Sequence, residues 1–348
     1  MNISRESIFI SAIRSFCNAF FAILGVVVCV VLIAVLIAFA MGGSSSVHKN
    51  QISLLPDANG NRDLLPITSP AILKINIDGI IGTGKLTAKQ IEHKLLESQE
   101  GMLKNNRVKG ILLHIDTPGG GVTDSNGIFE AIKAYKDKYN IPIFAYVDGM
   151  CASGGMYISS ATDRIYASEI SIIGSVGVIL GPVFNFHGLM EKWGIKAKTI
   201  AKGIDKAMLN PFTEWKNGED QSLLVITDYM YKHFVDLVVE ARPKLNKSKL
   251  INDYGAQVYI APTAAKLGFI DDGYSSYTKA LKDLTMAAGI KDGEKYQVVE
   301  LKTPKSFVLE VLENQTTSTS FGGLKQFLSS KKEVFELNEP FLYLYQPN

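Results

Sequence analysis

Two short stretches place a nucleophilic side chain close to uncovered backbone amides. In "MCASGGMY", Ser153 is followed by Gly154 and Gly155, and in "DTPGGGV" a proline precedes residues 119–121. A glycine in a helix interior lowers helix stability by about 1 kcal/mol relative to alanine. Two glycines at the start of a helix therefore suggest that the backbone there must stay free of side chains. Bare amides beside a serine hydroxyl can bind the oxyanion that forms when the hydroxyl attacks a carbonyl. Neither stretch matches a nucleotide-binding G-x-G-x-x-G or P-loop pattern, which disfavours a phosphate site.

A serine nucleophile needs a general base, and the sequence offers histidines and lysines. No histidine lies in a motif that points at Ser153, and there is no G-x-S-x-G elbow, so a Ser-His-Asp triad is disfavoured. A lysine can replace the histidine if burial keeps its amine neutral. Lys202 and Lys206 in "TIAKGIDKAMLNP" both lie in a suitable loop, and spacing alone does not choose between them. The neighbouring Cys151 precedes the glycine pair and is expected to be packed rather than nucleophilic.

Strands and helices alternate along the part of the chain that must position these loops. This alternation predicts an α/β fold with a largely parallel sheet. Both glycine turns follow strands, and loops at the carboxyl ends of parallel strands are where sites form. The clearest strands are expected at 71–81, 110–116 and 141–149, and the clearest helices at 87–103, 125–139 and 218–243.

Composition narrows the function classes. The 348 residues are 47% hydrophobic and 20% charged, with a formal net charge of +2, which gives no reason to expect a nucleic-acid partner. The 3 cysteines form no disulfide framework and no zinc-ligand spacing. We therefore expect no metal and no cofactor.

The N-terminal region contains an uncharged apolar run from Ala19 to Met41. As a helix of roughly 35 Å it can cross a membrane, and it is too long for the apolar part of a secretory signal peptide, the alternative interpretation. Arg5 and Arg14 precede it against one Glu6, which predicts a cytoplasmic N-terminus and an extracytoplasmic catalytic domain on the periplasmic side of the cytoplasmic membrane.

The expected organisation has five parts. They are a cytoplasmic N-terminus (1–18), a single transmembrane helix (19–41), a tether (42–70), a catalytic domain (71–284) and a partly flexible C-terminal extension (285–348). The chain ends in the apolar "FELNEPFLYLYQPN". We favour packing of this end on the outside of the fold; the alternative is that it enters an active site as an inhibitory peptide.

Four motifs in the order "DTPGGG", "ASGGMYISSATDRIYA", "IIGSVGVI" and "KGIDKAMLNP" resemble the signal peptide peptidase SppA family of membrane-anchored serine–lysine peptidases. The resemblance covers about residues 71–275. It implies a crotonase/Clp-protease-like fold of repeated ββα-type units, and an endopeptidase that degrades released signal peptides and other short or unfolded peptides.

The resemblance also implies a role for each residue that matches a family motif. Ser153 matches the nucleophile, Lys206 rather than Lys202 the general base, and Ser175 a serine that orients the lysine amine. Gly154 and Gly120 match the oxyanion donors, with Gly119 and Gly121 less favoured than Gly120. Thr117, Cys151 and Met156 depart from the commoner family residues without removing a catalytic atom.

Short members of this family imply a ring-shaped homo-oligomer, such as an octamer, in which neighbouring subunits can share a site. Two other functions stay open. A crotonase-type acyl-CoA enzyme would use similar glycine turns, but the membrane anchor and outward orientation argue against it. A catalytically idle membrane scaffold would have no need of an intact Ser153, Lys206 and Ser175 set, and a serine-reactive probe distinguishes it.

Overall fold

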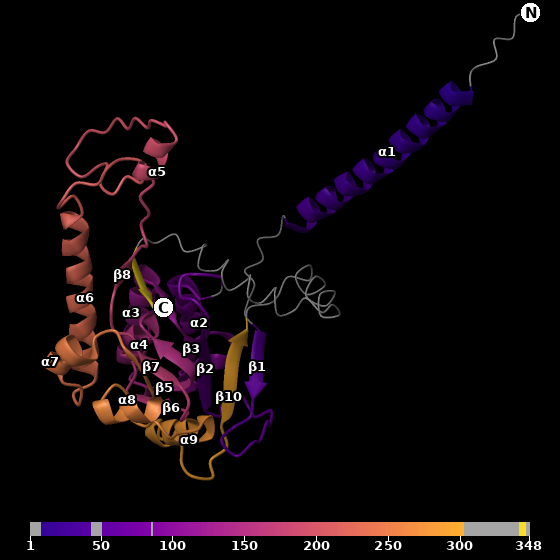
Figure 1. Cartoon of the computed structure of the whole chain (residues 1–348). Coiled ribbons are helices and arrows are strands. Elements are labelled where there is room, and N and C mark those ends of the chain that lie inside the picture. The colour runs from indigo at the N-terminus through magenta and orange to yellow at the C-terminus, as the bar shows by residue number, and fades with distance from the viewer. Residues whose placement is uncertain (1–7, 43–50, 85, 303–340, 346–348) are drawn as a thin grey trace, which may run out of the picture. The chain divides into compact units, whose positions relative to one another are not determined.

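The computed structural model describes residues 8–42, 51–84, 86–302 and 341–345 (Figure 1). The chain divides into two compact units, Met1–Lys49 and Asn50–Asn348. The first unit contains helix α1 (Ile8–Gly42). Among the side chains described there, the window Ile13–Ile33 has a mean hydropathy of 2.8 and none of it is buried. By length and composition α1 can cross a membrane, and it begins earlier in the chain than the expected 19.

The second unit is built on an eight-stranded sheet in the order β1-β10-β2-β3-β5-β7-β9, with β6 paired to β5. The centre of the sheet is parallel, because β2, β3, β5 and β7 pair in the same direction. This confirms the parallel α/β sheet predicted from the alternation. The strands are β1 (Gln51–Leu55), β2 (Ala71–Asp78), β3 (Val108–Thr117), β5 (Ile143–Ala152), β6 (Arg164–Ala167), β7 (Ile172–Gly174), β9 (Val258–Ile260) and β10 (Gln297–Lys302).

Helices cover both faces of this sheet (Figure 1). Successive strand residues point to opposite faces, so Leu113 packs in the larger core with Ile128 of α3, whereas Leu112 packs in the smaller core with Leu281 of α9. The larger core also receives side chains from α2, α4, α6 and α8. The helices are α2 (Ala88–Glu97), η1 (Gly101–Leu103), α3 (Val122–Tyr139), α4 (Gly154–Ser159), α5 (His187–Lys192), α6 (Gln221–Ala241), α7 (Lys247–Lys249), η2 (Leu250–Tyr254), α8 (Ala261–Leu267) and α9 (Tyr277–Ala287).

A second, three-stranded sheet has the order β4-β11-β8, formed by β4 (Gly119–Gly121), β11 (Phe341–Leu344) and β8 (Ile179–Leu180). The chain therefore passes from the large sheet to the small one and then into a helix twice, as β3–β4–α3 and as β7–β8 followed by α5 and α6. These are the expected ββα-type units, and they place the glycine strand β4 at the carboxyl end of β3.

Two strands lie where the sequence analysis expects a tether and an extension. Residues 51–55 form β1, and residues 297–302 form β10, which joins β1 to β2. Both strands are stabilised by hydrogen bonds to strands far away in the chain. The apolar pattern of their own short sequences therefore does not identify them as strands. Residues 196–203 form no strand, and Asp272 forms an isolated parallel bridge with Tyr166.

Residues 181–220, between β8 and α6, form an arm that extends beyond the two sheets (Figure 1). Large apolar side chains on the arm are exposed, including Trp193 at 76%, Ile200 at 87% and Ile204 at 96%. An exposed apolar surface of this kind is typical of a protein or membrane contact.

Candidate active site

Ser153 lies at the junction between β5 and α4, as the N-cap residue of that helix. It is 1% exposed, and its side chain does not cap the helix. Its N–H donates to the Gly174 carbonyl at 2.9 Å, and its carbonyl accepts from the Tyr157 N–H at 3.0 Å. Its φ of 53° and ψ of −111° are strained for a residue with a side chain, at a cost of about 1–3 kcal/mol. Backbone strain of this kind clusters at functional sites, where the surrounding structure holds it in place.

The glycines after Ser153 allow α4 to lie directly against the β3–β4 turn. A methyl group on Gly154 would lie 2.6 Å from Ser125 Oγ, and one on Gly155 would lie 2.8 Å from Thr117 Cγ2. Both distances are shorter than van der Waals contact, so alanine at residue 154 would push α4 away from α3, and alanine at residue 155 would push it away from the end of β3. The two glycines therefore bring the start of α4, with its backbone amides, close to β4.

The glycine strand β4 has one edge occupied by Ile81. The Ile81 N–H donates to the Gly119 carbonyl, and the Gly121 N–H donates to the Ile81 carbonyl, both at 2.9 Å. Alternate residues of a strand direct their N–H groups to opposite edges, so the Gly120 N–H faces the other edge. A methyl group on Gly119 would lie 2.8 Å from the Gly154 nitrogen. The two predicted oxyanion donors, Gly120 and Gly154, therefore come from neighbouring segments of backbone.

Ser175 directly follows β7, which pairs with the last residues of β5. It is 6% exposed, has a φ of 57°, and its N–H donates to the Gln257 carbonyl at 2.8 Å. The preceding residue, Gly174, accepts the Ser153 N–H. The structure thus brings Ser153, Gly154, Gly120 and Ser175 together where β4, β5 and β7 end.

Lys206 lies apart from this group, in the arm. Its side chain is exposed, and its backbone N–H donates to the Gly203 carbonyl at 3.4 Å. It lines a pocket within the arm together with Thr199 and Glu219, and neither Ser153 nor Ser175 lines that pocket. Lys202 is also exposed in the arm. Within the described part of one chain, the predicted lysine base is therefore not brought to the serine.

Cys151 is fully buried, and burial raises the pKa of its thiol to about 12. We expect iodoacetamide at pH 8 to leave Cys151 unmodified in the folded protein, because only about one thiol in 10,000 would be ionised. Mass spectrometry of a Cys17→Ser/Cys29→Ser chain checks this, with the guanidinium-unfolded chain as the labelled control. Equal labelling of the folded and unfolded chains would contradict the packed role.

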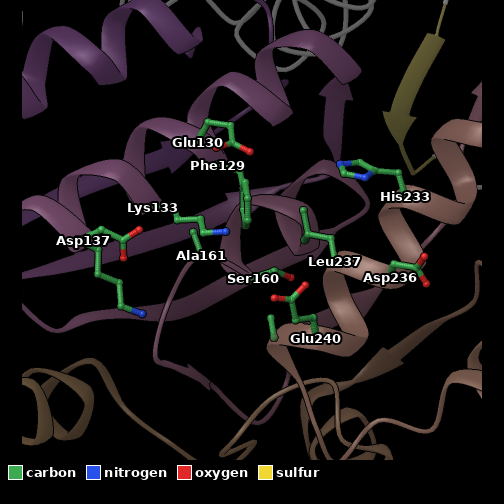
Figure 2. A pocket seen from close by; sticks show the side chains of 12 residues that line it. Phe129, Glu130, Lys133, Asp137, Ser160, Ala161, His233, Asp236, Leu237 and Glu240 are labelled. Atoms are coloured by element: carbon green, nitrogen blue, oxygen red, sulfur yellow. The ribbon is translucent and has the colours of Figure 1, made fainter.

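A separate cavity of about 350 Å³ lies between α3 and α6 (Figure 2). Its labelled lining carries charges of both signs, with Glu130 and Lys133 on α3 and Glu240 on α6. Ser153 does not line it. Phe129, which does, packs edge-to-face on Tyr157 of α4 with ring centroids 5.5 Å apart. The cavity therefore reaches the end of α4, at Ser160 and Ala161, and not its start at Ser153.

Two side chains, those of Asp116 and Thr117, shape the site in a way that was not predicted from the sequence. Asp116 accepts the Met150 N–H at 2.8 Å and so fixes the loop that leads to Ser153. Thr117 donates to the Gly79 carbonyl at 2.6 Å and accepts the Gly119 N–H at 3.0 Å, which shapes the glycine turn. The stretch "IDT" before the glycine turn indicates both roles, because short polar side chains next to a turn commonly form hydrogen bonds with its backbone.

Comparison with known proteins identifies a peptidase family and relatives assigned as peptidases. Residues 135–291 match peptidase family S49. An Enterococcus faecium protein assigned as the signal peptide peptidase SppA is 32% identical over 59% of this chain and 60% of its own length. A Methanocaldococcus jannaschii protein assigned as a protease is 33% identical over 62% of this chain and 67% of its own length.

The chain thus spans 60% and 67% of the lengths of these two relatives. Among solved structures, a mutant of the membrane-bound stomatin-specific protease 1510-N in complex with a substrate peptide is 16% identical. That match covers 72% of this chain and 98% of the other, with a TM-score of 0.40. Because the family match runs through Ser153, Ser175 and Lys206, and a relative one third identical is covered over two thirds of its length, this chain belongs to peptidase family S49.

Proposed function

We propose that this protein is a membrane-anchored serine endopeptidase that uses a Ser153–Lys206 dyad. The observation that carries the proposal is the strained Ser153 at the start of α4, with the Gly154 amide and the glycine strand β4 beside it. A serine in that position has its hydroxyl next to donors for an oxyanion, which is the arrangement that acyl transfer needs.

The proposed reaction proceeds in two steps. The Ser153 hydroxyl attacks a peptide carbonyl, and neutral Lys206 accepts the hydroxyl proton and passes it to the leaving amine as the C–N bond breaks. Water then hydrolyses the acyl-enzyme and restores the serine. The Gly154 and Gly120 amides stabilise the negative oxygen in both steps, and Ser175 orients the lysine amine. No metal or cofactor takes part in this scheme.

The lysine is proposed to come from a neighbouring subunit. Lys206 lies in the arm, whose exposed apolar side chains fit a contact with a second copy of this chain. A contact between one patch and a different patch on the next copy closes into a ring when the rotation allows it. We therefore propose a homo-oligomeric ring, such as an octamer, in which each arm completes the site of the next subunit.

The proposed substrates are released signal peptides and other short or unfolded peptides at the membrane. Helix α1 supports anchoring, and the basic residues before its apolar run support a cytoplasmic N-terminus with the catalytic unit outside the cytoplasm. The name of the Enterococcus faecium relative supports the substrate class. Residues 71–284 are the proposed peptidase domain, with β10 and β1 added at one edge of its sheet.

A serine-reactive probe tests the proposed function. We expect a fluorophosphonate to modify the full chain in detergent at Ser153, because only an activated serine hydroxyl reacts readily with it. Tandem mass spectrometry locates the adduct. Ser159→Ala is the matched control, since Ser159 lies in the same helix but donates to the Met156 carbonyl, and its loss is expected to leave labelling unchanged. Absence of labelling in the assembled wild-type protein would favour the idle scaffold.

A further inference from the structure

Apolar segments outside the large sheet differ in how far they are buried. The C-terminal strand β11 was expected to pack on the outside of the fold, and that expectation was wrong, because the strand lies between β4 and β8 with Tyr343 only 1% exposed. The tip of the arm, residues 191–205, is the opposite case, since every residue in it is exposed. Its large apolar side chains are Trp193 at 76%, Ile195 at 57%, Ile200 at 87% and Ile204 at 96% exposure. Removing such side chains from water is favourable, so the arm tip is a candidate contact surface.

Lysines are interleaved with these apolar side chains. The charged residues of the arm tip are Lys192, Lys196, Lys198 and Lys202 against Glu191 and Asp205, which is a net charge of +2. Among the residues that the structure describes, none of these four amines is paired with a carboxylate. The core of a contact between proteins is depleted of lysine. Basic side chains interleaved with tryptophan and aliphatic residues are instead typical of a segment that lies on an anionic bilayer.

The rest of the arm has a different character and can serve the proposed contact between subunits. There Phe186 stacks between Phe184 and Phe212, with ring centroids 6.4 and 6.3 Å apart, and all three rings are exposed. Lys206, the proposed base, lies just after the arm tip in the sequence. The arm therefore offers an aromatic surface to a second copy of this chain and a separate, basic tip to another partner.

The connection to α1 and the arm lie at the same end of the large sheet. Gln51, the first residue of β1, pairs with Lys302, the last residue of β10, and β10 is parallel to β2. The chain from α1 therefore enters the second unit at the carboxyl ends of the parallel strands. The arm follows β8 of the small sheet, which lies at that end, and Figure 1 shows the arm extending beyond the large sheet in the direction of the β10 arrow.

The length of the connection limits how far the membrane can be from this end. Residues 43–50 connect α1 to Gln51. A fully extended chain of that length spans at most about 30 Å, so a membrane crossed by α1 lies no further than this from Gln51. Because the arm extends from the same end of the sheet, its tip is directed toward that membrane.

We propose that the arm tip lies on the anionic surface of the membrane in which α1 is anchored, with Trp193 and the isoleucines in the interface and the lysines at phospholipid phosphates. The proposal rests on the membrane anchoring in the proposed function and not on its peptidase chemistry. It follows that each catalytic unit is held to the membrane at two points, α1 and the arm tip. Lys206 then stays close to the surface at which the proposed substrates are released.

Tryptophan fluorescence in vesicles tests this proposal, because the chain has 2 tryptophans and both lie in the arm. A Trp215→Phe full chain reports on Trp193. A Trp193→Phe chain reports on Trp215, which is half-buried and whose Nε1–H donates to the Asn210 carbonyl at 2.8 Å. Both chains carry the same α1 and are reconstituted into phosphatidylcholine vesicles that contain phosphatidylglycerol. When the phosphatidylcholine is brominated near the headgroup, Trp193 emission is expected to fall by roughly half or more, and Trp215 emission to change little.

The role of charge is tested separately. In vesicles without phosphatidylglycerol, the quenching of Trp193 is expected to weaken by about twofold or more, since the lysines then meet no anionic surface. A Lys196→Glu/Lys198→Glu change in the Trp215→Phe chain is expected to weaken it likewise in vesicles with phosphatidylglycerol. Lys244→Glu/Lys249→Glu is the matched control, because these exposed lysines lie outside the arm and the change in net charge is the same. Quenching in that control is expected to stay at the parent level.

Equal quenching of Trp193 and Trp215, or quenching of Trp193 that does not depend on phosphatidylglycerol, would overturn the proposal. A blue-shifted Trp193 emission without quenching would assign the arm tip to a contact with a second copy of this chain and would overturn it as well. Flotation of the vesicles reports anchoring by α1, and a chain that does not float with them has no anchor, so the proposal would fall with it. Failure of the peptidase chemistry would appear instead as absent probe labelling of Ser153 in detergent, which needs no bilayer.

Discussion

Ser153→Ala is expected to lower kcat on an unstructured apolar peptide by roughly 10⁴- to 10⁶-fold, the loss that follows removal of a serine nucleophile. The substitution removes only the hydroxyl oxygen. The Ser153 N–H bond to Gly174 and the packing of Gly154 against the β3–β4 turn do not need that oxygen, so the fold is retained. Hydrolysis is followed by chromatography of the peptide fragments, with the full chain in detergent.

Two controls make this result specific. Thermal unfolding of Ser153→Ala is expected to match the wild type, since alanine adopts the same strained backbone with no buried group left unpaired. Ser159→Ala, also on the α4 segment, is expected to keep its activity within about twofold, because the buried Ser159 hydroxyl donates to the Met156 carbonyl within the helix and not to a proposed catalytic residue. Wild-type turnover by Ser153→Ala would show that another residue is the nucleophile, and the assignment of Gly154 and Gly120 would be lost with it.

Lys206→Ala is expected to lower kcat by roughly 10²- to 10⁴-fold, the usual contribution of a general base. Lys202→Ala is the matched control, since Lys202 is an exposed lysine in the same arm, and we expect it to keep near wild-type activity. Rates of peptide hydrolysis are measured for the wild type and both variants under the same conditions, with the full chains in detergent. Equal losses for the two variants would indicate a structural effect on the arm rather than loss of a base.

Sharing of the site between subunits predicts that two inactive chains restore each other. An equal mixture of Ser153→Ala and Lys206→Ala chains, dissociated and reassembled, is expected to regain about a quarter of wild-type activity. In a ring with one heterologous contact per site, about one contact in four joins an intact serine to an intact lysine. Differently tagged chains that are purified together confirm that mixed assemblies form. Mixed assemblies without activity would contradict the shared site.

Much of the catalytic core was predictable because its signals are local. The alternation of strands and helices identified β2, β3, β5, α3 and α6 within a few residues, since apolar periodicity reports which face of each element is buried. The "ASGG" and "PGGG" stretches marked the turns at the ends of β5 and β3, because glycine is required where backbones approach closely. The strain at Ser153 was not predictable in this way, since serine has no intrinsic preference for a positive φ.

Pairing between distant segments was decided only in the tertiary structure. Strands β1 and β10 are stabilised by each other and by β2, and neither has a pattern that distinguishes it from a linker. Strand β11 has an apolar sequence, but its place between β4 and β8 depends on the free edge of Gly120 and on the pocket that Tyr157 and Phe234 form.

The separation of Lys206 from Ser153 has the same origin. The serine, the glycine amides and the lysine could each be recognised in the sequence, because each belongs to one short motif. Whether these groups come together depends on which surfaces are already buried within one folded chain and which stay exposed. The arm leaves Lys206 and its apolar neighbours exposed in one chain. Burial of that surface against another copy would lower its free energy, and such contacts follow from the folded shape rather than from any local stretch of the chain.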